Sequence, residues 1–451
     1  MPKKKTALTI EERLQQALVS AEEQPYEVPE NWVWVRLGSL ADVKGGKRLP
    51  KGTTFSENIT KHPYIRVTDF NAIGVSLEGL KYIDEDVYEK ISRYTISSDD
   101  IYVSIAGSIG KVGIIPSCID GANLTENAAK ITNIKGINQK YLCLFLKSEF
   151  AQYQMQSATI ATTQAKLALF RIESLTFPLP PLSEQQRIVE RIEELFAKLD
   201  EAKERLQEVA DSFAVRKAAI LHKAFTGELT QQWRCENGVS DESWEEKKFS
   251  EVAVIKSNLV SPFDYLDYPH IAPDSIEKFT GRLLSYRTIR EDNVKSPKHL
   301  FYKGQILYSK IRPYLSKAII ADVDGLCSAD MYPIEALCNT KYLLKYMLST
   351  EFLEQSTTAG SRSLLPKINQ KELSSISVPL PTLPEQHEIV RLIDDLLARE
   401  RKAQQAAEQA LASIDLMKKS ILARAFRGEL GTNKASEASA LELLKQVLAE
   451  N

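Results

Sequence analysis

The sequence has few of the residues that build disulfide frameworks, metal centres or membrane spans. It holds five cysteines and five histidines in 451 residues, and no two cysteines form a CxxC pair. This scarcity excludes a disulfide-rich scaffold and a zinc finger, and it is typical of the reducing cytoplasm. No run of about 18 apolar residues could span a bilayer, and Glu11, Glu12 and Arg13 interrupt any signal-peptide core. We expect a cytoplasmic protein with neither a metal site nor a membrane contact.

Catalytic motifs are also missing. The chain has no Asn/Asp-Pro-Pro-aromatic tetrapeptide, no FxGxG cofactor loop and no GxSxG nucleophile elbow. Residues 107–113 (GSIGKVG) include the lysine of a phosphate-binding loop, but Val112 stands where that loop needs Ser or Thr. We predict a tight turn between two strands there, and a protein that binds rather than catalyses.

Charge is balanced over the whole chain but clustered locally. The 58 basic and 60 acidic residues give a net charge of −2, which excludes a nucleic-acid binder that relies on basic tails. Yet residues 278–317 hold ten basic and two acidic residues, with aromatic side chains between them, and residues 44–66 hold six basic residues and one acidic residue. Such clusters suit phosphate neutralisation and contacts with base edges. A solvated surface of mixed charge is the alternative.

The sequence repeats itself at an offset of 201 residues. PLPPLSEQQRIVERIEELFAKLDE begins at Pro178 and PLPTLPEQHEIVRLIDDLLARERK begins at Pro379. AFTGEL at 224–229 likewise matches AFRGEL at 425–430. A looser match aligns three positions that open each half: Trp32, Leu37 and Leu40 with Trp244, Phe249 and Val252. A period this long indicates a duplicated domain rather than a solenoid.

Each repeat ends in a long amphipathic segment. Apolar or small residues recur in steps of four and three, a heptad pattern that predicts a coiled coil. In the first segment they are Ile188, Ile192, Leu195, Leu199, Ala202, Leu206, Val209, Phe213 and Ile220. In the second they are Ile389, Ile393, Leu396, Ala403, Ala407, Ala410, Ile414, Met417 and Ile421. Ser183 and Gln186 form a capping-box pattern, and Gly227 and Gly428 are expected to end the helices. We predict that the two helices pack antiparallel on each other; two separate helices, each buried in its own domain, are the alternative.

The remaining segments predict two mixed heads and two tails. Short β-rich runs and one helix near the end of each head give a fold class of α/β (α+β). Two tandem heads and two long antiparallel coiled-coil helices would form a pseudo-twofold, duplicated architecture. Amphipathic tail segments, the first with a capping pattern at Thr9 and Glu12, are expected to pack near each other. The expected boundaries are 1–31 (N-terminal tail helix), 32–178 (first head), 183–228 (first long helix), 229–243 (linker), 244–379 (second head), 384–428 (second long helix) and 429–451 (C-terminal tail helix).

Several segments of the sequence together carry a family resemblance. They are both PLP-x-L-x-EQ helix entries, both AF-x-GEL helix ends, PENWVWVRLGSLADVKGG at 29–46, DIYVSIAGSIGKVGI at 100–114, GANLTENAAKI at 121–131 and GQILYSKIRPYLSKA at 304–318. With these segments in this order, nearly the whole chain resembles the specificity (S) subunit of a Type I restriction–modification enzyme.

The resemblance implies a function for every part of the chain. Each head would be a target recognition domain that reads one half of a split, asymmetric sequence in double-stranded DNA. The long helices would be spacers on which two methyltransferase (M) subunits dock, and two restriction/translocase (R) subunits would join them in a bacterial or archaeal cytoplasm. S-adenosylmethionine, ATP and Mg²⁺ would be bound by these partners, and this chain would have no catalytic residue, cofactor or metal of its own.

We predict DNA contacts from residues of both heads. In the first head they are Lys44, Lys47, Arg48, Arg66, Ser104 and Lys111. In the second head they are Ser309, Lys310, Arg312, Lys317, Arg362 and Lys367. Arg312 is the expected base reader because its forked guanidinium suits guanine. An ion pair of Arg312 with Asp322, Asp324 or Asp330 is the structural alternative.

Two other classes of function stay open at this point. One is a self-contained DNA methyltransferase or nuclease with a diverged active site, which would turn over without partners. The other is a coiled-coil adaptor, which would bind no DNA and would leave the two basic clusters unexplained.

Overall fold

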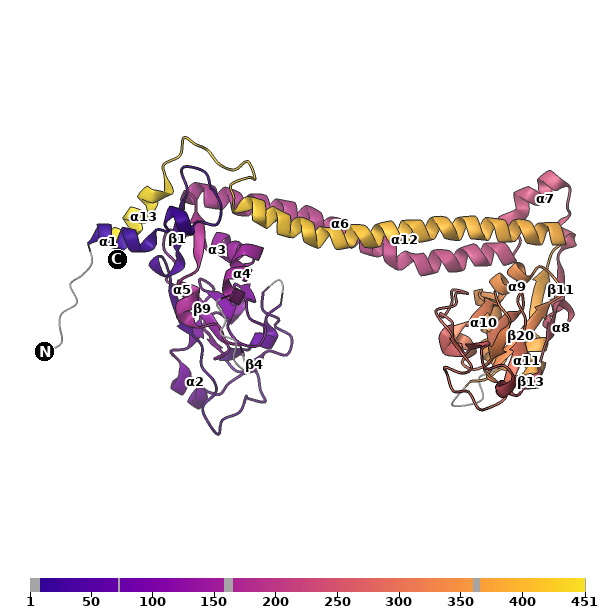
Figure 1. Ribbon diagram of the computed structural model, residues 1–451. Helices are drawn as coiled ribbons and strands as arrows, with labels where there is room; N and C mark the ends of the chain where they lie inside the picture. Colours follow the sequence, from indigo (N-terminus) through magenta and orange to yellow (C-terminus); the bar gives the residue numbers. More distant parts are fainter. Residues whose placement is uncertain (1–8, 72–73, 158–164, 360–365, 451) are drawn as a thin grey trace. The chain divides into compact units, whose positions relative to one another are not determined.

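The chain forms two compact units. The computed structural model (Figure 1) describes residues 9–71, 74–157, 165–359 and 366–450. Unit 1 holds residues 1–204 and 411–451, and unit 2 holds residues 205–410. Each unit contains one head and parts of both long helices, α6 (Leu182–Phe225) and α12 (Leu383–Ala425). The predicted mixed α/β fold with two long helices is therefore confirmed.

The head of unit 1 contains two four-stranded sheets, ordered β2–β9–β6–β7 and β4–β3–β8–β5, and a separate antiparallel pair, β1 with β10. The strands are β1 (Val33–Arg36), β2 (Asp42–Gly45), β3 (Pro63–Ile65), β4 (Lys81–Tyr82), β5 (Thr95–Ile96), β6 (Ile101–Ser104), β7 (Val112–Gly113), β8 (Ala122–Leu124), β9 (Ala128–Thr132) and β10 (Thr176–Leu179). The shorter helices of the unit are α1 (Ile10–Ala17), α2 (Glu85–Ile91), α3 (Gln139–Leu146), α4 (Glu149–Ser157), α5 (Leu169–Glu173) and α13 (Ala440–Ala449).

The head of unit 2 repeats this architecture. Its sheets are ordered β12–β20–β17–β18 and β13–β16–β19–β14–β15, and β11 pairs with β21. The strands are β11 (Glu245–Lys248), β12 (Ala253–Ile255), β13 (Leu259–Val260), β14 (Pro269–Ile271), β15 (Arg287–Thr288), β16 (Lys298–Phe301), β17 (Ile306–Ser309), β18 (Ala318–Ile320), β19 (Gly325–Cys327), β20 (Met331–Ala336) and β21 (Ser377–Leu380). The shorter helices are α7 (Gln231–Asn237), α8 (Phe249–Val252), α9 (Thr340–Met347), α10 (Thr350–Ala359) and α11 (Gln370–Ser374).

The strands β6 and β17 lie at the centre of their heads. Successive side chains of a strand point to opposite faces of its sheet. Accordingly Ile101 and Val103 pack into one apolar cluster of unit 1, whereas Tyr102 packs into another. Ile306 and Leu307 divide between two clusters of unit 2 in the same way. Because both faces are covered, these strands are buried along their whole length.

The long helices are antiparallel within each unit. In unit 1, Lys203 Nζ lies 3.8 Å from Asp415 Oδ1, whereas Lys418 Nζ lies 2.5 Å from Asp200 Oδ1, so residue numbers rise on one helix as they fall on the other. In unit 2, Arg216 Nε of α6 lies 2.8 Å from Glu400 Oε2 of α12. The predicted antiparallel pairing is confirmed.

The predicted heptad seam is wrong at several positions. Val209 is 42% exposed and Met417 is 50% exposed, and Ala403 is also exposed. An α-helix has 3.6 residues per turn rather than 3.5, so a strict heptad pattern drifts by about 20° per heptad around a straight helix. Ala210 is accordingly less exposed than Val209.

The capping predictions have mixed outcomes. Helix α6 begins at Leu182, where the N–H groups of Glu184 and Gln185 donate to the carbonyl of Pro181, so the capping box predicted at Ser183 is wrong. The left-handed glycines Gly227 (φ 80°) and Gly428 (φ 75°) follow the two long helices as predicted.

The two tails of the chain meet in unit 1, as predicted. The capping box of Thr9 and Glu12 is present at the start of α1. Helix α1 packs against α13, and Arg13 Nη1 donates to the carbonyl of Leu448 at 3.2 Å.

Candidate nucleic-acid interface

A buried Glu–Gln pair at the start of each long helix fixes the adjoining head. Glu184 accepts hydrogen bonds from Trp32 Nε1 (2.7 Å), Asn433 Nδ2 (2.9 Å) and Thr432 Oγ1 (3.2 Å). Gln185 Oε1 accepts from the N–H of Asn138, the residue that caps α3, at 2.6 Å. Since Glu184 and Gln185 are both fully buried, this network holds α6 and the first head in one arrangement.

Unit 2 repeats the network with one difference. Glu385 accepts from Trp244 Nε1 (3.1 Å), Thr230 Oγ1 (2.7 Å) and Arg234 Nη1 (2.7 Å). Gln386 Oε1 accepts from the N–H of Asn339, the cap of α9, at 2.9 Å. Glu385 therefore neutralises a buried guanidinium, whereas the donors to Glu184 are neutral.

The turn that follows β6 brings basic residues of the first head together. The N–H groups of Ile105 and Ala106 donate to the carbonyl of Asn127, in the loop between β8 and β9, at 2.8 and 3.2 Å. The N–H of Lys47 donates to the carbonyl of Leu124 at 2.8 Å, and Arg48 Nε lies 2.6 Å from Glu126 Oε1. The loop between β8 and β9 thus contacts both the turn and the segment of Lys47 and Arg48, and it places these two cations beside the turn. Gly107 (φ 74°) and Gly110 (φ 89°) complete the reversal, which confirms the predicted tight turn between two strands.

The turn between β17 and β18 is built in the same way. The N–H of Lys310 donates to the carbonyl of Asp330, in the loop between β19 and β20, at 3.0 Å. The N–H of Arg312 donates to the carbonyl of Pro366 at 2.8 Å, and Lys367 Nζ lies 3.3 Å from Asp330 Oδ1. Arg312 and Lys367 line a cavity of about 410 Å³ together with Pro273, Asp274, Ile311 and Asp330.

Two lysines close the turns at equivalent positions. The N–H of Ser104 donates to the carbonyl of Lys111 at 2.9 Å, and the N–H of Ser309 donates to the carbonyl of Lys317 at 3.0 Å. Lys111 Nζ donates to the carbonyl of Phe70 at 3.0 Å, and Lys317 Nζ donates to the carbonyl of Pro273 at 2.6 Å. Both ammonium groups thus contribute positive charge at the base of the turn.

Arg312 differs from Lys317 and Lys367, two other cations of the same turn. Lys367 faces Asp330, and Lys317 lies 3.7 Å from Asp274. Arg312 is exposed, and within the described ranges no carboxylate lies at ion-pair distance from it, so the alternative of a structural ion pair is not supported. Its backbone is left-handed (φ 49°), a conformation that costs a non-glycine residue about 1–2 kcal/mol. An exposed, unpaired guanidinium held in such a conformation is consistent with a ligand contact.

Several predicted contact residues already have partners inside the head, and one lies outside the described residues. Ser104 is fully buried and Ser309 is 2% exposed, and their hydroxyls donate inside the turn to the carbonyls of Ser108 and Ile311. Both serines therefore belong to the buried framework of the turn, and the structure does not support the DNA contacts predicted for their hydroxyls. Arg66 forms a two-pronged pair with Asp69, at 2.6 and 3.2 Å. Lys44 lies 3.5 Å from Asp42, and Arg362 lies outside the described residues.

Sequence reasoning missed Lys166. This exposed residue forms a β-bridge with Ala106 beside the first turn, as Lys367 does with Ile311 beside the second. The two lysines are separated by the repeat offset of 201, so an alignment of the two halves of the sequence could have identified Lys166 from Lys367.

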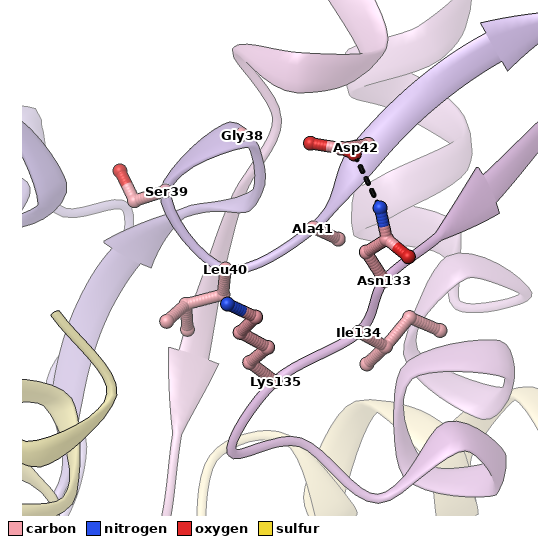
Figure 2. Close-up of a pocket in the computed structure, with 8 residues that line it drawn as sticks. All are labelled: Gly38, Ser39, Leu40, Ala41, Asp42, Asn133, Ile134 and Lys135. Atoms are coloured by element: carbon pink, nitrogen blue, oxygen red, sulfur yellow. Dashed lines mark hydrogen bonds between the residues drawn. The ribbon is translucent and has the colours of Figure 1, made fainter. Parts of the chain in front are cut away.

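A further cavity of about 640 Å³ lies in the first head, at the end of β2 and β9 away from the turn. Figure 2 shows its lining, in which Asn133 Nδ2 donates to Asp42 Oδ2 at 2.6 Å. Across the described ranges, no three His, Cys, Asp or Glu side chains are grouped to hold a metal ion. None of the helices in those ranges combines the length and apolarity needed to cross a bilayer.

The duplicated heads on paired helices define a two-headed recognition protein. The family model of the Type I restriction modification DNA specificity domain matches residues 29–211 and 241–409, so the chain belongs to the family of specificity subunits of Type I restriction–modification systems. Members of this family recognise the DNA target and are not themselves catalytic.

Individual relatives agree with this assignment. The Type I restriction enzyme EcoDI specificity subunit of Escherichia coli is 42% identical over 62% of this chain and 69% of its own length. The EcoBI specificity subunit of Escherichia coli is 25% identical over 94% and 93% of the two chains. The fold is similar to that of the HsdS subunit from Thermoanaerobacter tengcongensis, with a TM-score of 0.63 and 20% identity over 90% of this chain and all of the other.

Proposed function

We propose that each head reads one half of a bipartite, asymmetric DNA target through its hairpin turn. The observation that carries this proposal is the pair of equivalent turns with unlike tips. The frameworks match, because Ser104 and Lys111 correspond to Ser309 and Lys317. The tips differ, because Gly107 and Ser108 occupy one turn and Arg312 lies in the other. Equal frameworks with unequal side chains would give two different half-sites.

The proposed contacts divide into two kinds. Lys47, Arg48, Lys111 and Lys166 in the first head, and Lys310, Lys317 and Lys367 in the second, would neutralise phosphates. Lys44, Arg66 and Arg362 would be flanking phosphate contacts. Arg312 would donate two hydrogen bonds to the O6 and N7 atoms of one guanine.

The domain boundaries and partners belong to the same proposal. The target recognition domains would span 32–178 and 244–379, the spacer helices 183–228 and 384–428, the linker 229–243, and the tail helices 1–31 and 429–451. Two M subunits would dock on the spacer helices, and two R subunits would complete the complex in a bacterial or archaeal cytoplasm. S-adenosylmethionine, ATP and Mg²⁺ would be bound by those partners.

Methylation assays test the proposal. The purified chain incubated with DNA, Mg²⁺ and S-adenosylmethionine should give no turnover, and addition of the M subunit should give methylation of one bipartite sequence. Turnover by the chain alone would reject the proposal in favour of a self-contained enzyme.

A further inference from the structure

A cavity in unit 2 lies between the two long helices and the head. Its volume is about 410 Å³, within the range of about 300–1,000 Å³ that small-molecule sites occupy. The apolar part of its wall includes Phe213 and Ala214 of α6 and Leu397 of α12. Three cations also line it: Lys217 of α6, Lys345 of α9 and Arg401 of α12.

Positive charge exceeds negative charge at this cavity. Lys217 is half-buried, and its ammonium donates to the carbonyl of Phe279. Within the described residues neither Lys217 nor Arg401 has a carboxylate at ion-pair distance, whereas Lys345 pairs with Asp394 at 2.7 Å. Burial lowers the pKa of Lys217, and the nearby charges of Lys345 and Arg401 lower it further.

The acidic side chains around the cavity have other partners. Glu400 pairs with Arg216 at 2.8 Å, and Asp211 accepts a hydrogen bond from Gln207 at 3.0 Å. Glu277, whose charge raises the pKa of Lys217, pairs with Arg282 at 2.9 Å. Since Gln207 is neutral, Asp211 keeps its negative charge, but within the described residues it offsets only one of the two unpaired cations, Lys217 and Arg401, and an excess of positive charge remains.

The equivalent place in unit 1 is neutralised. At the repeat offset of 201, Lys217 corresponds to Lys418 and Arg401 corresponds to Asp200. Lys418 Nζ lies 2.5 Å from Asp200 Oδ1 and 5.1 Å from the centre of the Phe196 ring. The duplicated position thus carries an acid in unit 1 and a base in unit 2, and this reversal converts an internal ion pair into a pair of cations.

We propose that the cavity lined by Lys217, Lys345 and Arg401 binds a small anion with several phosphate-type oxygens, of the pyrophosphate class. Such an anion would accept hydrogen bonds from two or three cations at once. It would neutralise Lys217 as Asp200 neutralises Lys418 in unit 1. A single inorganic phosphate would fill less of the volume. The ammonium of Lys217 is half-buried and already donates to the carbonyl of Phe279, which favours a small anion over the backbone of a DNA duplex. The proposed site is separate from the DNA-reading turns and goes beyond the proposed function.

Calorimetric titration of the full-length chain with pyrophosphate, and separately with phosphate, tests this site. Saturable binding of one pyrophosphate per chain is expected, with weaker binding of phosphate. Arg401→Asp would restore the ion pair seen in unit 1 and should weaken pyrophosphate binding by about tenfold or more. Lys402→Asp is the matched control, because it makes the same charge change at an exposed position that does not line the cavity, and it should leave binding unchanged.

Three results would overturn the proposal. The first is no saturable binding of pyrophosphate by the wild-type chain. The second is an equal loss in Arg401→Asp and Lys402→Asp, which would show only a general charge effect. The third is a wild-type chain that does not bind pyrophosphate, combined with M-subunit assembly that Arg401→Asp impairs and Lys402→Asp does not; this would assign the cavity to an acidic side chain of a protein partner. Thermal melting of both variants verifies that they fold.

Discussion

The buried carboxylate of Glu385 is expected to hold the segment that follows α6 in place, and Glu385→Gln tests this contact. Glu385 is fully buried and Arg234 is 6% exposed, so their pairing is shielded from solvent. Loss of one partner of a buried ion pair typically costs about 3–5 kcal/mol. Asp241 still pairs with Arg234 at 2.7 Å but is 80% exposed, so it compensates only in part. We expect Glu385→Gln to cost about 2–3 kcal/mol in local stability.

Glu184→Gln is the matched control in unit 1. Its donors are the neutral groups of Trp32, Asn433 and Thr432, and a glutamine keeps one acceptor oxygen for them. The Thr432 hydroxyl can rotate and accept a hydrogen bond from the new amide. We expect a cost of about 1 kcal/mol or less.

Hydrogen exchange measured by mass spectrometry reads out both variants locally. At about 1.4 kcal/mol per tenfold, Glu385→Gln should raise exchange in residues 228–237 by roughly 30- to 140-fold. Glu184→Gln should raise exchange in residues 429–437 by less than about tenfold. Equal increases in the two variants, or no increase in Glu385→Gln, would refute the role assigned to the Glu385–Arg234 pair.

Three further predictions follow from other contacts. Deletion of residues 435–451 removes α13, which packs on α1, and also removes the Glu437 carboxylate, which pairs with Arg187 at 2.7 Å. We expect this deletion to weaken M-subunit binding in a pull-down, and undiminished binding would contradict a role of the tails in M-subunit binding. Burial raises the pKa of Asp100, but hydrogen bonds from Lys130 and Thr132 outweigh it and lower the pKa below its usual 3.8. The pair therefore stabilises the first head at neutral pH, and this contribution is lost as the pH falls below about 3.8. In acid unfolding followed by circular dichroism, stability should fall less steeply with pH in Asp100→Asn than in the wild-type chain. Identical curves for the two would refute this contribution of Asp100. Lys166→Ala and Lys367→Ala should each reduce the slope of log binding constant against log salt concentration for DNA by about one. Salt titrations of DNA binding by the S–M complex measure this slope. An unchanged slope in either variant would show that the substituted lysine does not contact DNA.

The repeat made much of the architecture predictable. The predicted alignment of Trp32 with Trp244 is confirmed by their hydrogen bonds. The indole N–H of each donates to the glutamate at the start of a long helix, Glu184 or Glu385. The remaining partners were not predictable, because Thr230 and Thr432 reach those glutamates from the ends of the opposite long helices. No local pattern encodes a contact between residues so far apart in the sequence.

The surroundings of the candidate contact residues were harder to predict than the fold. In the sequence, Ser104 and Ser309 come after three apolar residues and before glycine- or proline-containing turns, a pattern that favours exposed loop residues. Their hydroxyls instead bond inside the turn, which depends on the exact path of the backbone. Lys166 lies outside both basic clusters and is brought to the turn only by a bridge to Ala106.

Methylation mapping of cells that carry this chain with its M partner tests the central claim most directly. The decisive variant is Arg312→Lys, which keeps the positive charge and the side-chain length but loses the fork that suits guanine. We predict relaxed recognition, worth about 1–3 kcal/mol, at a single position of one half-site, with the other half-site and the spacer unchanged. An unchanged target, or simultaneous changes in both half-sites, would contradict the assignment of one half-site to each head.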